Sequence, residues 1–100
     1  MTVVHPPRRI VVCASLSHPD LIDAAVVELS APGIEVHVPE TGRFPQAETA
    51  RAAWFALIEI ADEVVAIPQP GGVVGDAVLE DVQHAVEFGV PVRWWSTTPT

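Results

Sequence analysis

Three carboxylates near the end of the chain stand where they could do chemistry. Asp76, Glu80 and Asp81 follow a glycine- and proline-rich segment, residues 68–75, and begin an amphipathic stretch. Carboxylates serve as nucleophiles or proton carriers in catalysis, but they also cap helices or simply lie in solvent. The position of each carboxylate on its helix therefore has to be found first.

At 100° per residue, the stretch 76–88 places its apolar residues on one side, which we expect to face a sheet: Val78, Val82, Ala85, Val86 and Gly89. Glu80 and Glu87 fall opposite, in solvent, and Asp76 is expected to act as the N-cap. Asp81 falls on the flank of the apolar face, beside His84 and Phe88. A carboxylate there would be half-buried at the rim of a crevice, with its pKa set by desolvation against the helix dipole.

The elements that position these groups follow from alternating patterns. Continuous apolar runs predict buried strands, and helical spacing predicts helices between them. Ser17 is expected to cap the first helix, which ends at Pro32-Gly33. The strands are expected at 9–13, 34–38, 63–67 and 90–95, and the later helices at 48–61 and 76–88.

This order predicts an α/β fold: a small flavodoxin-like three-layer sandwich, with a parallel four-stranded sheet in the order 2-1-3-4 and three helices. We expect a single domain over residues 1–100, with 1–7 and 96–100 irregular. In such sheets ligands bind beyond the carboxyl ends of the strands, where the strand order reverses. Loops 14–18 and 68–75 would meet there.

Several polar residues and glycines could have either a binding role at this crevice or a purely structural role. Ser15 and Ser17 offer polar contacts in the first loop. The glycines of the second loop either cradle a phosphate or allow turns with positive φ. Asp62 either ends a helix or orients a ligand. Arg43 and Arg51 either meet a phosphate or another subunit, or lie on the surface.

Composition narrows the class of partner. Five basic residues, all Arg, stand against thirteen acidic ones, for a net charge of −8, which repels nucleic acid polymers. One cysteine excludes a disulfide framework and fits a cytoplasmic protein; Cys13 itself is expected in the core. No apolar run is long enough to span a membrane, and from the layout of the first residues we expect no secretory signal. The histidine spacing predicts no metal site.

Two adjacent blocks resemble the nucleoside 2-deoxyribosyltransferase-like family. One is residues 60–67, IADEVVAI, and the other is residues 71–92, GGVVGDAVLEDVQHAVEFGVPV. The family's short bacterial and phage members end in a glycine loop, a pair of small hydroxyl residues, an acid, an alanine and Gly-Lys-Pro-Val. The similarity covers roughly residues 54–95, and the first half of the chain matches only in layout.

The resemblance implies a chemistry and a site. In that family a glutamate on this helix attacks the anomeric carbon of a nucleoside, expels the base and passes the sugar on. Alignment puts Asp81 at the nucleophile position. The residues implied to position the sugar are Ser15, Asp62, Gly71, Gly72 and Gly75, and no cofactor is implied.

The sequence also departs from the family pattern. Aspartate is one methylene shorter than glutamate, and Ala77 and Val78 replace the hydroxyl pair. No Tyr is present to orient the nucleophile. The expected ligand is a nucleoside or nucleoside monophosphate, with cleavage or transfer of its N-glycosidic bond. The alternative is a non-catalytic nucleotide-binding or oligomerisation module that retains the fold.

The second predicted helix has an apolar face wider than one sheet contact needs. Together with Trp54, Phe55, Trp94 and Trp95, this width predicts a homo-oligomer.

Overall fold

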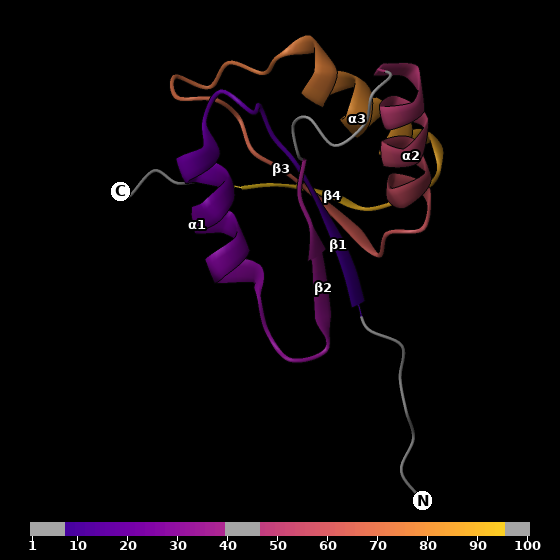
Figure 1. The fold of residues 1–100 in the computed structure, drawn as a ribbon, viewed down its shortest axis with the longest axis horizontal. Coiled ribbons are helices and arrows are strands. Elements are labelled where there is room, and N and C mark those ends of the chain that lie inside the picture. The colour runs from indigo at the N-terminus through magenta and orange to yellow at the C-terminus, as the bar shows by residue number, and fades with distance from the viewer. Residues whose placement is uncertain (1–7, 40–46, 96–100) are drawn as a thin grey trace, which may run out of the picture.

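Four parallel strands form one sheet in the computed structural model, which describes residues 8–39 and 47–95 (Figure 1). The strands are β1 (Arg8–Cys13), β2 (Ile34–His37), β3 (Glu63–Ala66) and β4 (Val92–Trp94), in the order β2-β1-β3-β4. This arrangement confirms the predicted α/β class, the parallel sheet and the strand order. The predicted irregular ends, 1–7 and 96–100, lie outside the described residues.

Helices cover both faces of the sheet. They are α1 (Pro19–Leu29), α2 (Ala47–Glu59) and α3 (Asp76–Glu87). Figure 1 shows α1 on one side of the sheet and the pair α2 and α3 on the other. The three-layer sandwich expected from the βαβ alternation is therefore present.

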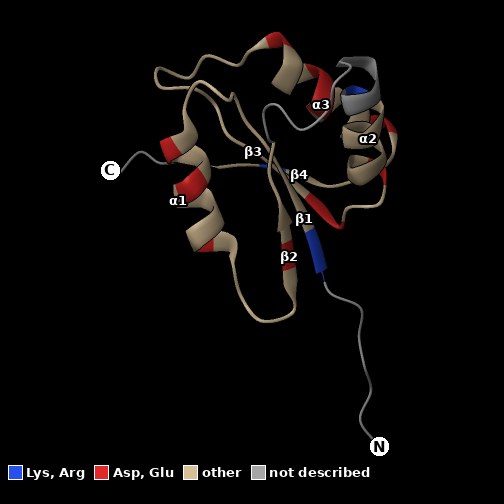
Figure 2. Cartoon of the chain, viewed as in Figure 1, with Lys and Arg blue, Asp and Glu red and all other residues tan. Residues whose placement is uncertain are grey.

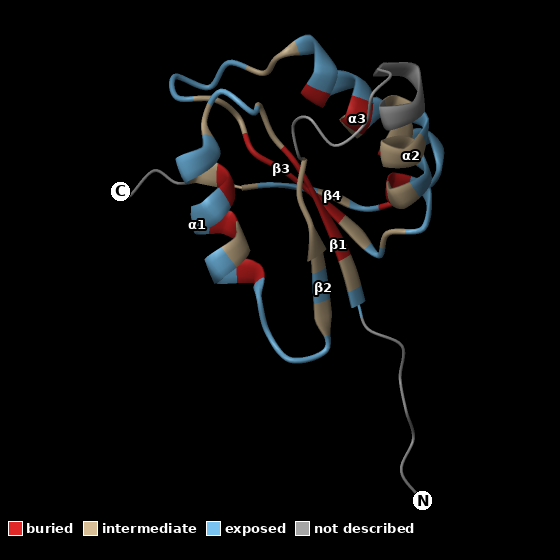
Figure 3. Cartoon of the chain, in the orientation of Figure 1, coloured by how far each residue is buried: buried red, intermediate tan, exposed pale blue. Residues whose placement is uncertain are grey.

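The central strands are apolar because they are covered twice. Residues 10–13 of β1 are buried, and they alternate between two core clusters. Val11 and Cys13 face α2 and α3, whereas Ile10 and Val12 face α1. Figure 3 shows burial concentrated in β1 and β3.

Surface charge is mostly acidic. Figure 2 shows acidic residues on α1 and α3, and the arginine pair Arg8-Arg9 at the start of β1. Among the described residues, Arg8 pairs with Glu63 and Arg9 pairs with Glu35, at the amino ends of the strands.

Helix ends differ in part from the expectation. His18, not Ser17, is the N-cap of α1, and no side chain caps it; Ser17 instead donates its backbone N–H to Oγ of Ser15 at 3.2 Å. α3 is closed by a glycine just after its last residue, because Gly89 adopts the left-handed conformation with a φ of 72°. The N–H of Gly89 bonds to the carbonyl of Val86, and that of Val90 to the carbonyl of Ala85. This Schellman pattern closes the helix and sends the chain into β4.

Candidate functional site

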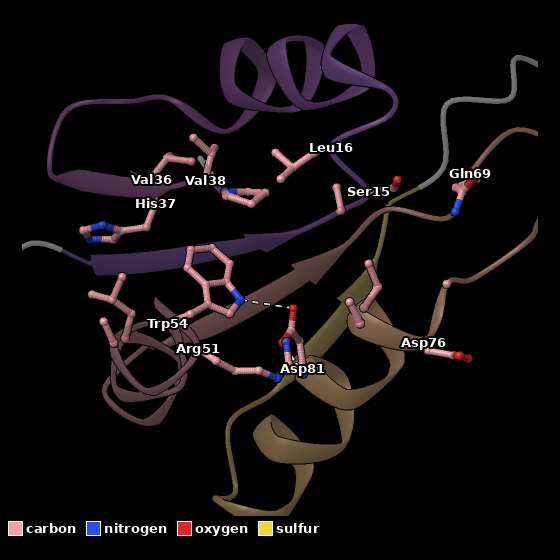
Figure 4. Close-up of a pocket in the computed structure, with 17 residues that line it drawn as sticks. Ser15, Leu16, Val36, His37, Val38, Arg51, Trp54, Gln69, Asp76 and Asp81 are labelled. Atoms are coloured by element: carbon pink, nitrogen blue, oxygen red, sulfur yellow. Dashed lines mark hydrogen bonds and ion pairs between the residues drawn. The ribbon is translucent and has the colours of Figure 1, made fainter. Parts of the chain in front are cut away.

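A pocket of about 740 Å³ opens at the carboxyl ends of β1 and β2, against α2 and the start of α3 (Figure 4). The predicted crevice at this edge of the sheet is thus present, and it extends toward the β2 side. Its wall is mostly apolar. The residues that line it are Ala14, Ser15, Leu16, Val36, His37, Val38, Pro39, Arg51, Ala53, Trp54, Leu57, Gln69, Gly75, Asp76, Ala77, Val78 and Asp81.

Asp81 is the buried carboxylate of this pocket, with 6% of its surface exposed. It lies in the buried stripe of α3, between Val78 and Ala85, which are three residues before it and four after. The expectation that Asp81 would be half-buried on a flank is corrected: it lies within the sheet-facing stripe. Val86, expected on that stripe, is 64% exposed.

The two carboxylate oxygens of Asp81 have different partners. Oδ2 accepts a hydrogen bond of 3.1 Å from the indole nitrogen of Trp54 (Figure 4). Oδ1 is buried and has no hydrogen-bond partner within the described residues. An unpaired buried oxygen is costly unless a ligand or a proton satisfies it.

Burial raises the pKa of Asp81 above its ordinary value, because the charged form loses its hydration. The hydrogen bond from Trp54 and the guanidinium of Arg51 lower the pKa of Asp81 and oppose that effect. The Glu80 carboxylate raises the pKa further, and the Cys13 thiol lowers it. A carboxyl group whose pKa is raised by burial and lowered by specific partners is common at functional sites.

Cys13 lies beneath this carboxyl group and is fully buried. Burial raises the pKa of the Cys13 thiol far above its usual value, and the nearby Asp81 adds to the rise. A neutral thiol is a poor nucleophile. Cys13 is therefore the core residue that the sequence predicted.

Arg51 links the two helices at the mouth of the pocket. Its guanidinium pairs with Glu80 and lies 3.9 Å from Oδ1 of Asp81. Its Cζ also lies 4.7 Å from the centre of the Phe55 ring. Glu80 is 58% exposed at its side chain, in keeping with the solvent position expected for it. Arg43, considered beside Arg51, lies outside the described residues.

An aromatic stack holds α2 against α3. The His84 ring lies 4.2 Å from that of Phe55 and 4.6 Å from that of Phe88, and its Nε2 is 2.8 Å from a Glu59 oxygen. The width of the apolar face of α2 is thus used in part within the chain, because Phe55 covers α3 as well as the core.

The other predicted site residues divide between the pocket and the rest of the chain. Ser15 and Gly75 line the pocket. Gly71 and Gly72 do not; they form an exposed turn with φ values of 89° and 81°, closed by the bond from Gln69 N–H to the Val73 carbonyl. Of their two predicted roles, the turn role is the one their geometry requires.

Asp62 lies at the opposite edge of the sheet. It precedes β3, so it sits at the amino end of the strand, and its Oδ2 accepts a 2.7 Å hydrogen bond from the Arg9 N–H. This corrects the expectation that Asp62 orients a ligand at the site. Asp76 is also corrected: Gly75 is the N-cap of α3, with no side-chain cap, and Asp76 is the first helical residue and lines the pocket.

Trp54 was expected at an oligomer surface, yet it lines the pocket and bonds to Asp81. The available signal was its place on the apolar face of the second predicted helix, three residues after Arg51. That signal predicts burial but gives no hint of a partner 27 positions away. Trp95 likewise turns inward and donates its indole N–H to Glu28 at 2.7 Å.

Residues 8–39 and 47–95 contain no group of three or more His, Cys, Asp or Glu side chains placed to hold a metal ion. In the same segments, no helix has both the length and the apolar character required to cross a membrane.

No protein-family model matches the sequence, and no curated protein matches it. Among solved structures, the fold matches that of a 2-deoxyribosyltransferase from Leishmania mexicana with a TM-score of 0.75 and 16% sequence identity. The match covers 92% of this chain and 66% of the other, so the chain spans about two thirds of the length of that protein. The chain therefore has a nucleoside 2-deoxyribosyltransferase-like fold, as the two sequence blocks indicated.

Proposed function

We propose that the protein binds a nucleoside or a nucleoside monophosphate in this pocket and breaks or transfers its N-glycosidic bond, with Asp81 as the nucleophile. The observation that carries the proposal is Asp81, a carboxylic acid with only 6% of its surface exposed that lines the pocket of a deoxyribosyltransferase-like fold. A buried carboxyl group with one oxygen that lacks a hydrogen-bond partner among the described residues costs stability, and such groups recur at functional sites.

The composition of the pocket supports a ligand of this class. Trp54, Leu57 and Val38 offer an aromatic and aliphatic wall of the kind that accommodates a heterocyclic base. Ser15 offers a hydroxyl and Gln69 an amide for polar contacts with a sugar. The volume of about 740 Å³ lies in the range of small-molecule sites.

The reaction would follow two displacements at the anomeric carbon. A lone pair of an Asp81 carboxylate oxygen forms a bond to this carbon while the carbon–nitrogen bond to the base breaks; the bonding electrons leave with the base nitrogen, which takes a proton from water. Water or a second base then attacks the same carbon, the ester bond to Asp81 breaks, and the attacking group loses its proton to solvent.

The first displacement requires an ionised Asp81. Burial favours the protonated form, so the rate is expected to rise with pH through the pKa of Asp81, which lies above its ordinary value. Trp54 and Arg51 favour the charged form and so support the reactive state.

Incubation with a panel of ribonucleosides, deoxynucleosides and their 5′-monophosphates, followed by chromatography of released base, tests the proposal. Asp81→Asn is expected to abolish release. Asp23→Asn, an identical change on the exposed surface of α1, is the matched control and should leave release unchanged. If the unaltered protein releases no base at high concentration, the catalytic claim is refuted.

The alternative is a non-catalytic nucleoside-binding module. It is favoured by the short Asp81 side chain, by its burial, and by Ala77 and Val78, which line the pocket without hydroxyl groups. A displacement of about 1 Å at the reacting atom can reduce a rate about 10²-fold. Asp81→Glu discriminates the two: creation or a large gain of base release would identify a degenerate enzyme. Binding that raises the melting temperature without turnover in either form would identify the module.

We also propose a homo-oligomer, supported by the exposed large apolar side chains Ile60, Phe88 and Trp94, which are 56%, 53% and 48% exposed. Light scattering at micromolar concentration checks the mass, and a monomer would contradict it. A single buried cysteine supports a reducing, cytoplasmic setting.

A further inference from the structure

The surroundings of Asp81 distinguish its two oxygens. Oδ2 is occupied by the indole N–H of Trp54, at 3.1 Å, while Oδ1 has no hydrogen-bond partner within the described residues. The two side chains come from different helices, α2 and α3, and meet at the pocket wall (Figure 4). The bond to Oδ2 thus fixes the carboxyl group of α3 relative to α2.

Trp54 is suited to hold Oδ2 of Asp81 in place. Its indole packs against the core cluster that contains Ile58 and Val78, which limits its motion. An indole nitrogen is a donor only, so the bond to Oδ2 has one direction whatever the charge of Asp81. The chain contains no Tyr that could supply a phenolic donor instead.

We propose that Trp54 is the positioning residue of this site: by holding Oδ2 it fixes the orientation of the Asp81 carboxyl group at the pocket wall. This inference rests on the proposed function and adds the group that orients its nucleophile. Trp54 does not itself react; it acts through the carboxylate.

The charged groups around Asp81 define what Trp54 contributes. Arg51 approaches from α2 at 3.9 Å from Oδ1, the neutral Cys13 thiol lies below on β1, and Glu80 precedes Asp81 on α3. Loss of a hydrogen-bond donor from a carboxylate raises the pKa of that carboxylate. Removal of the indole N–H should therefore shift the titration of Asp81 to higher pH, even with Arg51 in place.

The test is a pH titration of ¹³C-labelled aspartate carboxyl groups by NMR, with Asp81→Asn identifying the resonance of Asp81. We expect Trp54→Phe to move the midpoint of Asp81 to higher pH. Trp95→Phe is the matched control, because it removes the same kind of N–H to carboxylate bond, to Glu28, on the other face of the sheet. The control should leave the midpoint of Asp81 unchanged. An unchanged midpoint in Trp54→Phe would overturn the inference.

A second measurement uses the unaltered protein and does not depend on Trp54→Phe folding. The indole N–H resonance of Trp54 should titrate with the same midpoint as Asp81 and should lose that transition in Asp81→Asn. A Trp54 indole resonance that does not shift as Asp81 titrates would contradict the inference.

Base release separates this inference from the function it rests on. If the protein is active, kcat of Trp54→Phe should fall about 10²-fold with a smaller change in KM, and its acidic limb should move to higher pH. Titration shifts without base release in any form would refute the proposed catalysis while the positioning contact stands. Base release with an unmoved Asp81 midpoint would refute the positioning role alone.

Discussion

The indole nitrogen of Trp54 donates to Oδ2 of Asp81 over 3.1 Å, and this bond joins α2 to α3 inside the pocket wall. Asp81 occupies a position in the buried stripe of α3 where Val78 and Ala85 are its neighbours. An apolar residue there would avoid the desolvation of a carboxyl group. Retention of an acid in such a place is expected where its chemistry is used, which is why Asp81 anchors the proposed function.

Asp81→Asn should stabilise the protein at neutral pH. The amide keeps an acceptor for Trp54 but carries no charge to desolvate. The folded-state pKa of Asp81 is raised by burial, so its favourable contribution is fully present below the unfolded pKa of about 3.9 and is lost as pH rises through the folded value. The melting temperature of Asp81→Asn should therefore exceed that of the unaltered protein at pH 7.

Thermal unfolding across pH 4–8 measures this difference. In a domain of this size about 1 kcal/mol moves Tm by about 4–8 °C, so a modest effect is detectable. The gap between the two proteins should widen as pH rises through the folded pKa and then level off. Asp23→Asn, at an exposed position of α1, should show no such widening gap. A lower Tm for Asp81→Asn at neutral pH would contradict the prediction.

Arg51→Gln should alter the titration of Asp81 more than the stability of the fold. The Arg51 side chain is 37% exposed and its partner Glu80 is 58% exposed, so loss of this pair should cost less than about 1 kcal/mol. Loss of the guanidinium removes a group that lowers the pKa of Asp81, so Asp81 should ionise at higher pH.

The same carboxyl NMR titration measures the effect, and Arg93→Gln is its control. Arg93 pairs with Glu63 at 3.2 Å on β3 and β4, and its side chain is 52% exposed. It should change neither the Asp81 midpoint nor the site. An Asp81 midpoint that moves to lower pH in Arg51→Gln would be inconsistent with the charge arrangement described.

The architecture was predictable because its signals are local. Apolar runs such as 10–13 and 64–67 are buried on both faces of the sheet. Gly33 and Gly89, which have positive φ, lie in the turns that lead from a helix to the next strand. Alternation of strands and helices, with right-handed crossovers, then leaves few strand orders. Strand ends differed from the structure by a residue or two, which is the ordinary uncertainty of boundaries.

The site was less predictable because its determinants are long-range. Helical projection treats polar residues as outward, so it placed Val86 inside and Asp81 on a flank. Asp81 meets Trp54, which comes from another helix 27 positions away, and no local pattern encodes this bond. The error at Asp62 was avoidable, since a residue before a parallel strand lies at the opposite edge from residues that follow one.

Asp62→Ala should lower stability without affecting ligand binding or base release. The carboxylate accepts the Arg9 N–H at 2.7 Å, and the Asp62 N–H donates to the Arg9 carbonyl at 2.9 Å, so together they close the amino end of the β1–β3 ladder. Loss of the side-chain bond should cost about 0.5–1.5 kcal/mol. Urea unfolding measures the loss, and Asp62→Asn, which keeps an acceptor, should lose less. Weaker nucleoside binding by folded Asp62→Ala would restore a ligand role for this residue.

Gly72→Ala should affect mainly stability, and Gly75→Ala should affect mainly binding. Gly72 has a φ of 81°, and a Cβ there would meet no atom within 4 Å, so its cost is conformational, about 1–2 kcal/mol. Gly75 has a φ of −71°, and its Cβ would make an ordinary contact of 3.5 Å with Gln69 Nε2. Alanine is a poorer N-cap than glycine but reduces the freedom of the unfolded chain, and these effects oppose one another.

Gly72→Ala should therefore lower Tm by several degrees and leave nucleoside affinity unchanged, since Gly72 lies outside the pocket wall. Gly75→Ala should change Tm less but alter affinity, because Gly75 lines the pocket beside Asp76. Thermal unfolding gives the first quantity, and calorimetric titration with the nucleoside that most raises Tm gives the second. Loss of affinity in folded Gly72→Ala, with Tm unchanged, would show instead that this turn holds the ligand.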